Sequence, residues 1–410
     1  GTEGTDFGTV SDITISAGST TGTVTFDPTD DSVYEGNETA GISVSGVSGG
    51  GASESGTQAV TITITDNESA PTVTLTTSAT SIAENAGSSL TLTATLSVAT
   101  TADVTVALST SGTATEGTDY TDGSGVVNDI TISAGSTTGT VNFTPTDDSV
   151  YEGDETATIA VSGVSGGSAT ESGTQSVTIT ISENESAPTV TLATSATSIA
   201  ENAGSSLTIT ATLSTATTAD VTVTIGTAGT ATEGTDYTDG SGNLDDITIS
   251  AGATTGTVSF TPTDDASDPV YEENETAVIS IDGVSGGSAS ESGSQSVTIT
   301  ITENESAPTV TLARSAASIA ENSGSTVTLT ATLSIKVDEA VTVALSTSGT
   351  ATEGTDYGTI SDITISAGAT TGTATFDPTD DSVYEDDEAA TIAIDSVSGG
   401  GASESGSQSV

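Results

Sequence analysis

Acidic side chains gather in four short segments between residues 71 and 187, and the chemistry open to them is the binding of a cation. The segments read SIAENAG, GTDY, TDDSVYEGDE and SENES. Their carboxylates belong to Glu84, Asp119, Asp147, Asp148, Glu152, Glu155, Glu183 and Glu185. Calcium takes roughly six to eight oxygen ligands, whereas zinc, copper and haem use the His and Cys side chains that this chain lacks. The residue types therefore favour calcium.

Strict alternation of apolar residues with threonine predicts the elements that position these acids. Seven short strands are expected in residues 71–187, marked by Val73/Leu75, Leu90–Leu96, Val104/Val106, Ile130/Ile132, Val141/Phe143, Ala157–Val161 and Val177–Ile181. The acidic segments stand at strand ends, and alternate connections of a seven-stranded sandwich meet at one pole. Two like charges roughly 4 Å apart repel by about 4 kcal/mol at an effective dielectric constant of about 20. Bound cations would turn this repulsion into a contribution to folding.

Internal repetition sets the domain organisation. GTDY or GTDF recurs at Gly4, Gly117, Gly234 and Gly354, with spacings of 113, 117 and 120 residues that suit a small β-sandwich. The repeats predict four modules, named here modules 1 to 4: residues 1–70, 71–187, 188–307 and 308–410. We expect the fold class to be all-β, a linear array of tandem seven-stranded immunoglobulin-like Greek-key β-sandwiches.

The outer modules are predicted to be partial. Module 1 lacks its opening strands, and module 4 stops before its closing strand. Residues 1–60 match residues 351–410 at a constant offset of 350. We therefore expect the native polypeptide to be longer, or neighbouring chains to complete the two ends.

The ordered set ENAG, GTATEGTDY, PTDDSVYEGDE and VTITISENES resembles the Calx-β domain, a calcium-binding module of sodium/calcium exchangers and of many large extracellular proteins. The resemblance extends over essentially the whole chain. It implies that the eight acids of module 2 are calcium ligands, with the carbonyl of Val150 as a backbone ligand. It also implies two or more Ca²⁺ ions in each complete module.

The same pattern implies ligands in the other modules. In module 3 they are Glu201, Asp236, Asp264, Asp265, Glu272, Glu275, Glu303 and Glu305, and the insertion Ala266–Pro269 adds Asp268. In module 4 they are Glu321, Asp356, Asp380, Asp381, Glu385 and Glu388. In module 1 they are Asp6, Asp30, Asp31, Glu35, Glu38, Asp66 and Glu68. Calcium-binding members typically close with a run of Asp, whereas this chain has ENE or DNE. The alternative is that the acids only solvate the loop ends.

Composition excludes several function classes. The chain has 57 Asp and Glu against two Lys and Arg, a formal net charge of −55, so nucleic acids and anionic membranes are repelled. No apolar run is long enough to span a membrane. Catalysis is not expected, because nucleophilic mechanisms lack a His or Cys and the paired carboxylates have no apolar pocket. The twelve aromatic residues fall at three module positions and are expected to be core anchors.

The function expected first is structural: a calcium-stiffened filament or stalk, extracellular or at the cell surface and bacterial. The closing acidic segment runs through only Ala187 and Pro188 into the next module, so an ion there would limit bending. The alternatives are the spacer of a large calcium-dependent adhesin, and a calcium buffer or sensor. The expected partners are other copies in a fibre or neighbouring modules of a longer chain. Surface glycans stay open, with acceptor motifs at Asn37, Asn67, Asn142, Asn184, Asn274 and Asn304.

Overall fold

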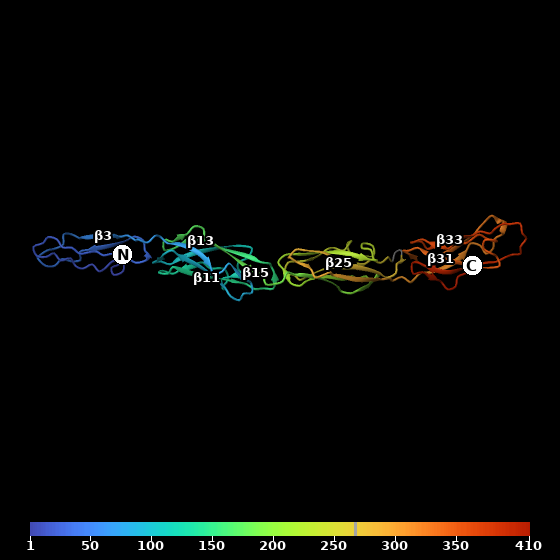
Figure 1. The fold of residues 1–410 in the computed structure, drawn as a ribbon, viewed down its shortest axis with the longest axis horizontal. Coiled ribbons are helices and arrows are strands. Elements are labelled where there is room, and N and C mark those ends of the chain that lie inside the picture. The colour runs from blue at the N-terminus through green and yellow to red at the C-terminus, as the bar shows by residue number, and fades with distance from the viewer. Residues whose placement is uncertain (266–268) are drawn as a thin grey trace. The chain divides into compact units, whose positions relative to one another are not determined.

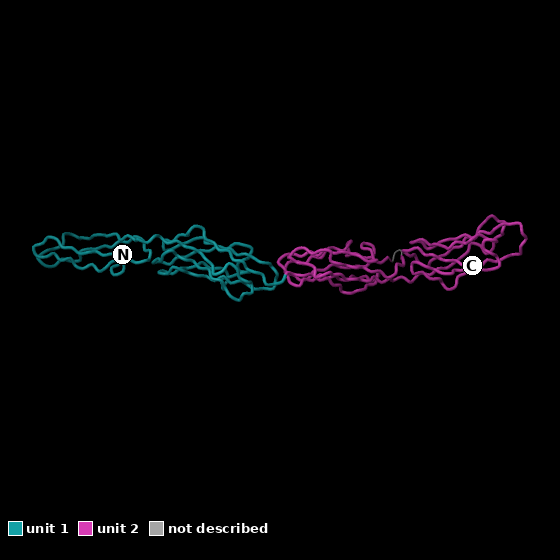
Figure 2. Tube along the Cα trace, viewed as in Figure 1, with its two compact units in different colours: residues 1–186 teal, residues 187–410 magenta. Residues whose placement is uncertain are grey.

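The structure is a computed structural model that describes residues 1–265 and 269–410. Its regular structure is almost entirely β-strand, and within these residues the one helix is the three-residue 3-10 turn η1 (Glu321–Ser323). No helix of the described chain is long and apolar enough to cross a membrane. The chain divides into two compact units, residues 1–186 and 187–410 (Figure 2). The expected all-β class is confirmed.

Module 2 is a sandwich of two five-stranded sheets (Figure 1). The first sheet has the order β14 (Thr170–Glu171), β4 (Thr72–Thr77), β6 (Leu90–Leu96), β11 (Thr138–Pro145), β9 (Tyr120–Thr121). The second has the order β10 (Ile130–Ile132), β8 (Val104–Gly112), β13 (Glu155–Ser165), β15 (Ser176–Ser182), β5 (Ser81–Ala83). The seven predicted strands are all present, and strands of two or three residues extend the sheet edges.

Unit 2 repeats this arrangement. In module 3 the first sheet has the order β21 (Tyr237–Thr238), β23 (Thr255–Pro262), β18 (Leu207–Leu213), β16 (Thr189–Thr194), β26 (Ser290–Glu291). The second sheet has the order β17 (Ser198–Ala200), β27 (Ser296–Thr302), β25 (Glu275–Ser285), β20 (Val221–Gly229), β22 (Ile247–Ile249). In module 4 a four-stranded sheet has the order β33 (Thr371–Phe376), β29 (Val327–Leu333), β28 (Thr309–Arg314), β35 (Ser403–Glu404). A three-stranded sheet has the order β32 (Ile363–Ile365), β31 (Val341–Gly349), β34 (Ala390–Ser398). Module 1 contributes the antiparallel pair β2 (Glu38–Ser43) and β3 (Ala59–Ile64).

The core of each module follows from the period of two. Along β6, Leu92, Ala94 and Leu96 are buried, and the intervening threonines lie on the other face of the sheet. An aromatic pair lies deep in this core: the rings of Tyr120 and Phe143 stack with their centroids 4.6 Å apart. Both side chains are almost completely buried, as are Tyr237 and Phe260 in module 3. Aromatics at these two repeat positions are therefore core anchors in modules 2 and 3, as predicted. The prediction is wrong for the third position: Tyr34, Tyr151 and Tyr271 are only half-buried and Tyr384 is 90% exposed, because this position lies in the acidic loop outside the core of its own module.

Truncating the core ring tests this packing. Phe143→Ala is expected to lower the free energy of unfolding by about 3–5 kcal/mol, because it removes a fully buried ring and leaves a cavity. Chemical denaturation followed by circular dichroism measures the change. Val60→Ala is the matched control, since Val60 is 60% exposed and its loss is expected to cost less than about 0.5 kcal/mol. A small effect of Phe143→Ala would show that the module tolerates a loose core.

Two-residue strands connect neighbouring modules inside each unit. In unit 1, β1 (Val33–Tyr34) of module 1 pairs in parallel with β7 (Ala99–Thr100) of module 2. In unit 2, β24 (Val270–Tyr271) of module 3 pairs in parallel with β30 (Lys336–Val337) of module 4. The strands β12 (Val150–Tyr151) and β19 (Ala216–Thr217) occupy the equivalent repeat positions. Within each unit, the Val–Tyr dipeptide of the acidic loop is thus a docking strand for the following module.

Candidate metal centre

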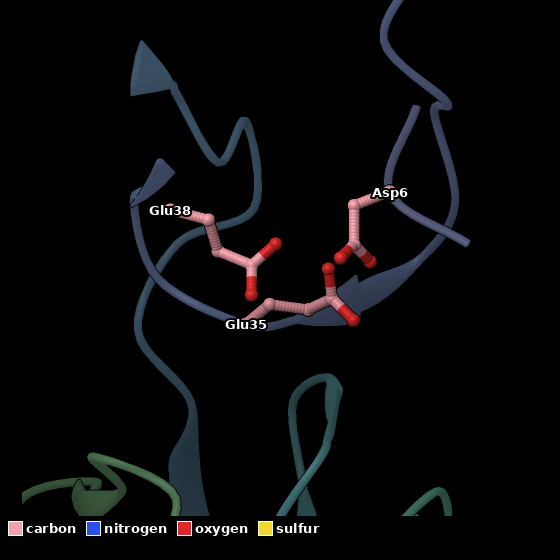
Figure 3. Close-up of side chains that lie close together, drawn as sticks. All are labelled: Asp6, Glu35 and Glu38. Carbon is pink, nitrogen blue, oxygen red and sulfur yellow. The ribbon is translucent and has the colours of Figure 1, made fainter. Parts of the chain in front are cut away.

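Three carboxylates of module 1 converge on one point (Figure 3). Asp6 lies in the turn before Phe7, Glu35 directly follows β1, and Glu38 opens β2. One oxygen atom from each of the three side chains lies within 4.8 Å of the other two. A cavity of about 40 Å³ lies beside them, lined by Asp31, Glu35, Glu38, Asp66 and Glu68 among others. The arrangement brings acids from two separate loops around a space that a small ion could enter.

Modules 2 and 3 each contain two such triads. In module 2 they are Glu84, Glu183 and Glu185, and Asp119, Glu152 and Glu155; in module 3 they are Glu201, Asp265 and Glu305, and Asp236, Glu272 and Glu275. The two triads of a module repel one another. Burial and then the charge of Asp119 raise the pKa values of Glu155 and Glu152 most. Smaller increases come from the other triad, from Glu84 for Glu155 and from Glu183 for Glu152. Each module thus carries one continuous acidic cluster.

A buried tyrosine positions Asp119. Tyr120 fixes the end of the turn in the core, and the Asp119 carboxylate accepts the Thr115 N–H at 2.5 Å. The carbonyl of Asp119 accepts the Thr146 N–H at 2.9 Å, which ties this turn to the next acidic loop. The chain enters the turn through Gly112 at φ +132°, where a Cβ would lie 2.0 Å from the Thr156 carbonyl oxygen. Only glycine permits that approach.

Glu183 holds the acidic loop to the closing segment. Its Oε2 accepts the N–H groups of Glu152 and Gly153 at 2.6 and 2.8 Å, and its Oε1 accepts the Glu185 N–H at 2.9 Å. Burial raises the pKa of Glu183, but these N–H groups lower it more, so the net pKa lies below 4.5. Glu183 is therefore ionised, and backbone N–H groups hold its carboxylate in position, before any ion binds.

Several other carboxyls have strongly raised pKa values. Burial raises the pKa of Glu84 from 4.5 to about 7. The hydrogen bond from the Asp148 N–H lowers this pKa, and the charge of Glu183 raises it further. Burial and the charge of Asp119 raise the pKa of Glu155 to about 7. Burial raises the pKa values of Glu201, Glu272 and Glu275 to about 7, and hydrogen bonding to the ionised Glu303 carboxylate raises that of Glu305 to about 7. Without a cation, the cluster holds protons near neutral pH.

The residues present fit a hard divalent cation. Within the described part of the chain, two buried carboxylate oxygens, Glu185 Oε2 and Asp265 Oδ1, have no hydrogen-bond partner, which is costly unless an ion satisfies them. Each like-charged pair 4.8 Å apart costs about 3.5 kcal/mol at an effective dielectric constant of about 20. Oxygen ligands in this number suit calcium. The donor set is all oxygen, as the sequence predicted.

The remaining predicted ligands lie around these triads. Asp148 and its counterparts Asp31 and Asp381 accept the N–H two residues ahead, at Val150, Val33 and Val383. Asp66 and Glu303 accept backbone N–H groups as Glu183 does. Hydrogen bonding to the ionised Glu183 carboxylate raises the pKa of Glu185, burial and the charge of Glu183 raise it further, and the charge of Asp147 adds a smaller repulsion. Asp30 and Asp264 accept the side-chain amides of Asn67 and Asn304. The Val150 carbonyl stays a prediction, and Asp268 lies outside the described residues.

Most of the predicted acids of module 4 are exposed to solvent. Glu321 accepts the Asp381 N–H at 2.9 Å, although both side chains are exposed. Slight burial and then the charge of Asp356 raise the pKa values of Glu385 and Glu388. Asp380 is exposed beside Asp381. The fourth site is thus the least enclosed of the four.

One positioning residue was missed by the sequence analysis. The residue before the strand-opening glutamate accepts the backbone N–H of the closing acid: Asn37 for Asp66, Asp154 for Glu183 and Asn274 for Glu303. Its recurrence as Asn or Asp directly before Glu38, Glu155 and Glu275 was the available signal. This bond holds the two acidic loops of a module together.

A tandem array of all-β sandwiches with acidic clusters in their loops defines a class of cation-binding repeat modules. The Calx-β domain model matches residues 1–68, 66–185, 183–305 and 303–408. The chain therefore belongs to the Calx-β family, whose domains are in general calcium-binding. The predicted resemblance is confirmed.

Solved structures of similar fold include CBD12 from CALX1.2 (15% identity, TM-score 0.24, covering 56% of this chain and 99% of that one). The calcium binding domain CBD12 of CALX1.1 gives 15% identity and a TM-score of 0.23, over 54% of this chain and 96% of that one. Invasin, a bacterial integrin-binding protein, gives 18% identity and a TM-score of 0.28, over 80% of this chain and 56% of that one. A search of curated proteins found no match.

Proposed function

We propose that this chain is a calcium-stiffened structural repeat, part of an extracellular filament or stalk. The observation that carries the proposal is the continuity between the acidic loop and the docking strand. Val33 and Tyr34 pair with module 2, and Glu35 of the module 1 triad is the very next residue. Tyr271 pairs with module 4, and Glu272 of a module 3 triad follows it. An ion that orders the loop therefore orders the junction.

Local hydrogen bonds connect ligand and docking strand more closely still. The Asp31 carboxylate accepts the Val33 N–H at 2.8 Å, and Asp265 accepts the N–H of Val270. The docking strand is thus bracketed by one acid before it and one after it. Bound Ca²⁺ would neutralise these acids and cross-link the loops that carry them. The junction would then lose freedom to bend, as a quasi-one-dimensional array requires.

We propose that the two triads of each complete module hold two or more ions. In module 2 the holders are Asp119, Glu152 and Glu155, and Glu84, Glu183 and Glu185, with Asp147, Asp148 and the Val150 carbonyl as further candidate ligands. Extracellular modules of other folds bind calcium at about 10⁻⁴–10⁻³ M. Such affinity suits an outside location, which we propose together with a bacterial source. We propose no enzymatic activity, since the acids are committed to the cation cluster.

Removing two ligands tests the site. Glu152→Gln/Glu155→Gln is expected to weaken calcium binding at one triad by about tenfold or more, because two of its three charges are lost. Isothermal titration of the whole chain measures the loss. The substitution is also expected to raise the melting temperature of the calcium-free chain, because it removes like-charge repulsion. The matched control is Asp12→Asn, which removes an exposed charge outside the triads and is expected to change neither property.

If the acids only solvate loop ends, the double variant and Asp12→Asn will behave alike. Electron microscopy of the calcium-loaded protein separates two structural roles. Regular multi-chain fibres support a filament, and isolated threads support the spacer of a calcium-dependent adhesin. Lateral self-association, or junctions with further modules, is the proposed partnership. We propose no glycan on Asn67, Asn184 or Asn304, whose side-chain nitrogens donate to acids of the cluster.

A further inference from the structure

Tyr271 belongs to one module but packs against the core of the next. It ends the docking strand β24 of module 3, pairs with Val337 of module 4, and lies against the hydrophobic core of that module. Val337 is itself fully buried, and it replaces the threonine found at Thr100 and Thr217. An aromatic ring seated in an apolar pocket is the usual anchor of a protein–protein contact. This junction therefore has an apolar centre.

A glycine of module 4 makes room for that ring. In the loop Gly399–Gly401, a Cβ on Gly401 would lie 2.6 Å from Cε1 of Tyr271 and 3.2 Å from its hydroxyl oxygen. The same atom would lie 3.0 Å from Oε1 of Glu273. These distances are too short for any side chain at position 401 while the ring and the carboxylate stay in place. We call Val337, Gly400 and Gly401 the Tyr271 socket.

The backbone of this loop does not itself demand glycine. Gly401 has φ +60°, but the equivalent residues of modules 2 and 3 are Ser168 and Ser288, with φ of +55° and +52°. Serine therefore fits the loop conformation in two of the four modules; module 1 has glycine at this position, Gly51, at φ +67°. The turn alone therefore does not require glycine at position 401, whereas the ring of Tyr271 and the carboxylate of Glu273 leave no room there for a Cβ.

The docking loop of module 3, on the other side of this junction, also differs from the docking loops of modules 1 and 2. The residue two after the docking tyrosine is glycine in modules 1 and 2, Gly36 and Gly153, but Glu273 in module 3. Glu273 adopts the same left-handed conformation, at φ +66°, which a non-glycine residue rarely takes. Along the sequence, a loop with glycine at this position precedes a module with serine, and the loop with Glu273 precedes the module with Gly401.

We propose that Tyr271 with Glu273, and the Tyr271 socket, form a neighbour-selecting contact that fixes which module follows which. A loop of the Tyr-Glu-Glu type docks on a module with glycine at the position of Gly401, and a serine there rejects it. The selected partner is a Calx-β module with a Val337-like apolar docking strand and a three-glycine loop. The proposal does not rest on calcium, because the contact consists of a ring, a carboxylate and a glycine.

The first test is Gly401→Ser in the full chain, which installs the residue of modules 2 and 3. Hydrogen exchange measured by mass spectrometry is read in the peptides that contain β24 and β30. Both are expected to exchange about tenfold faster or more, because the docking strands separate more often. The matched control is Ser168→Gly in unit 1, which enlarges the space instead and is expected to leave exchange at β1 and β7 unchanged.

A double-mutant cycle distinguishes the proposed contact from a simple folding defect of module 4. Tyr271→Ala removes the ring and is expected to accelerate exchange at β24 and β30 to a similar extent. Adding Gly401→Ser to Tyr271→Ala is then expected to have little further effect, because the serine no longer meets the ring. The inference is overturned if Gly401→Ser alone leaves junction exchange unchanged, or if its effect is equally large with and without Tyr271.

Discussion

Removal of calcium is expected to lower the melting temperature of this chain by on the order of 15 °C. The reason is that modules 1 to 3 hold carboxylate oxygens within 4.8 Å of one another, and that Glu185 Oε2 and Asp265 Oδ1 are buried without a hydrogen-bond partner among the described residues. A ligand present at a thousand times its dissociation constant stabilises a fold by about 4 kcal/mol. Several ions per chain make the total larger. Differential scanning calorimetry in 10 mM calcium and after dialysis against EDTA measures the change, taking about 10 mM as a saturating level.

Magnesium provides the control for general screening of charge. The smaller ion requires near-octahedral geometry at shorter distances and gives up water reluctantly, so a flexible cluster of long Glu side chains suits it poorly. We expect magnesium to restore less than about a third of the loss. Equal melting temperatures in calcium and EDTA would show that the acidic clusters do not bind the ion usefully. Equal rescue by magnesium would reduce their role to screening.

The second large effect is a reversal of pH dependence by calcium. Glu84, Glu155, Glu201 and Glu275 have pKa values raised from 4.5 to about 7 in the folded chain. The folded state therefore binds these protons more tightly than the unfolded state does. Their contribution to stability is complete below pH 4.5 and is lost as the pH rises through about 7.

The calcium-free chain is accordingly expected to melt at a higher temperature at pH 5 than at pH 8, by several degrees. Because calcium competes with the same protons, its stabilising effect is expected to grow from pH 5 to pH 8. Melting curves of dialysed and calcium-loaded protein at both pH values test the reversal. Glu152→Gln/Glu155→Gln is the control and is expected to flatten the pH dependence of the calcium-free form. Parallel pH profiles with and without calcium would contradict the account.

Much of the fold could be predicted because its signals are local. Alternation at Leu92, Ala94 and Leu96 shows which face is buried without knowledge of any partner strand. The recurrence of Tyr120 and Phe143 at fixed repeat positions marked the core rings that the structure stacks. The seven main strands, including the three-residue β10, were predicted correctly, whereas the short edge strands β5, β9 and β14 were not. Such short pairings carry no period and exist only because another strand lies beside them.

The sequence predicted which acids form the candidate site, but not how these acids divide into triads. The motifs identified the acids that converge, yet nothing in the order of residues assigns Asp119 to Glu155 and Glu84 to Glu185. That division depends on how loops separated by tens of residues fold back on one another. The bond from the Glu183 N–H to Asp154 was likewise invisible, because it joins a strand start to a closing segment 29 residues away.

The amino-acid sequence by itself determined an all-β repeat of Calx-β modules with acids at strand ends, since a period of two and recurring motifs depend only on neighbouring residues. The tertiary structure alone decided which carboxylates share a site and how Tyr271 meets Gly401. Those contacts depend on distances between separate loops and modules, where a difference of 1 Å separates contact from collision.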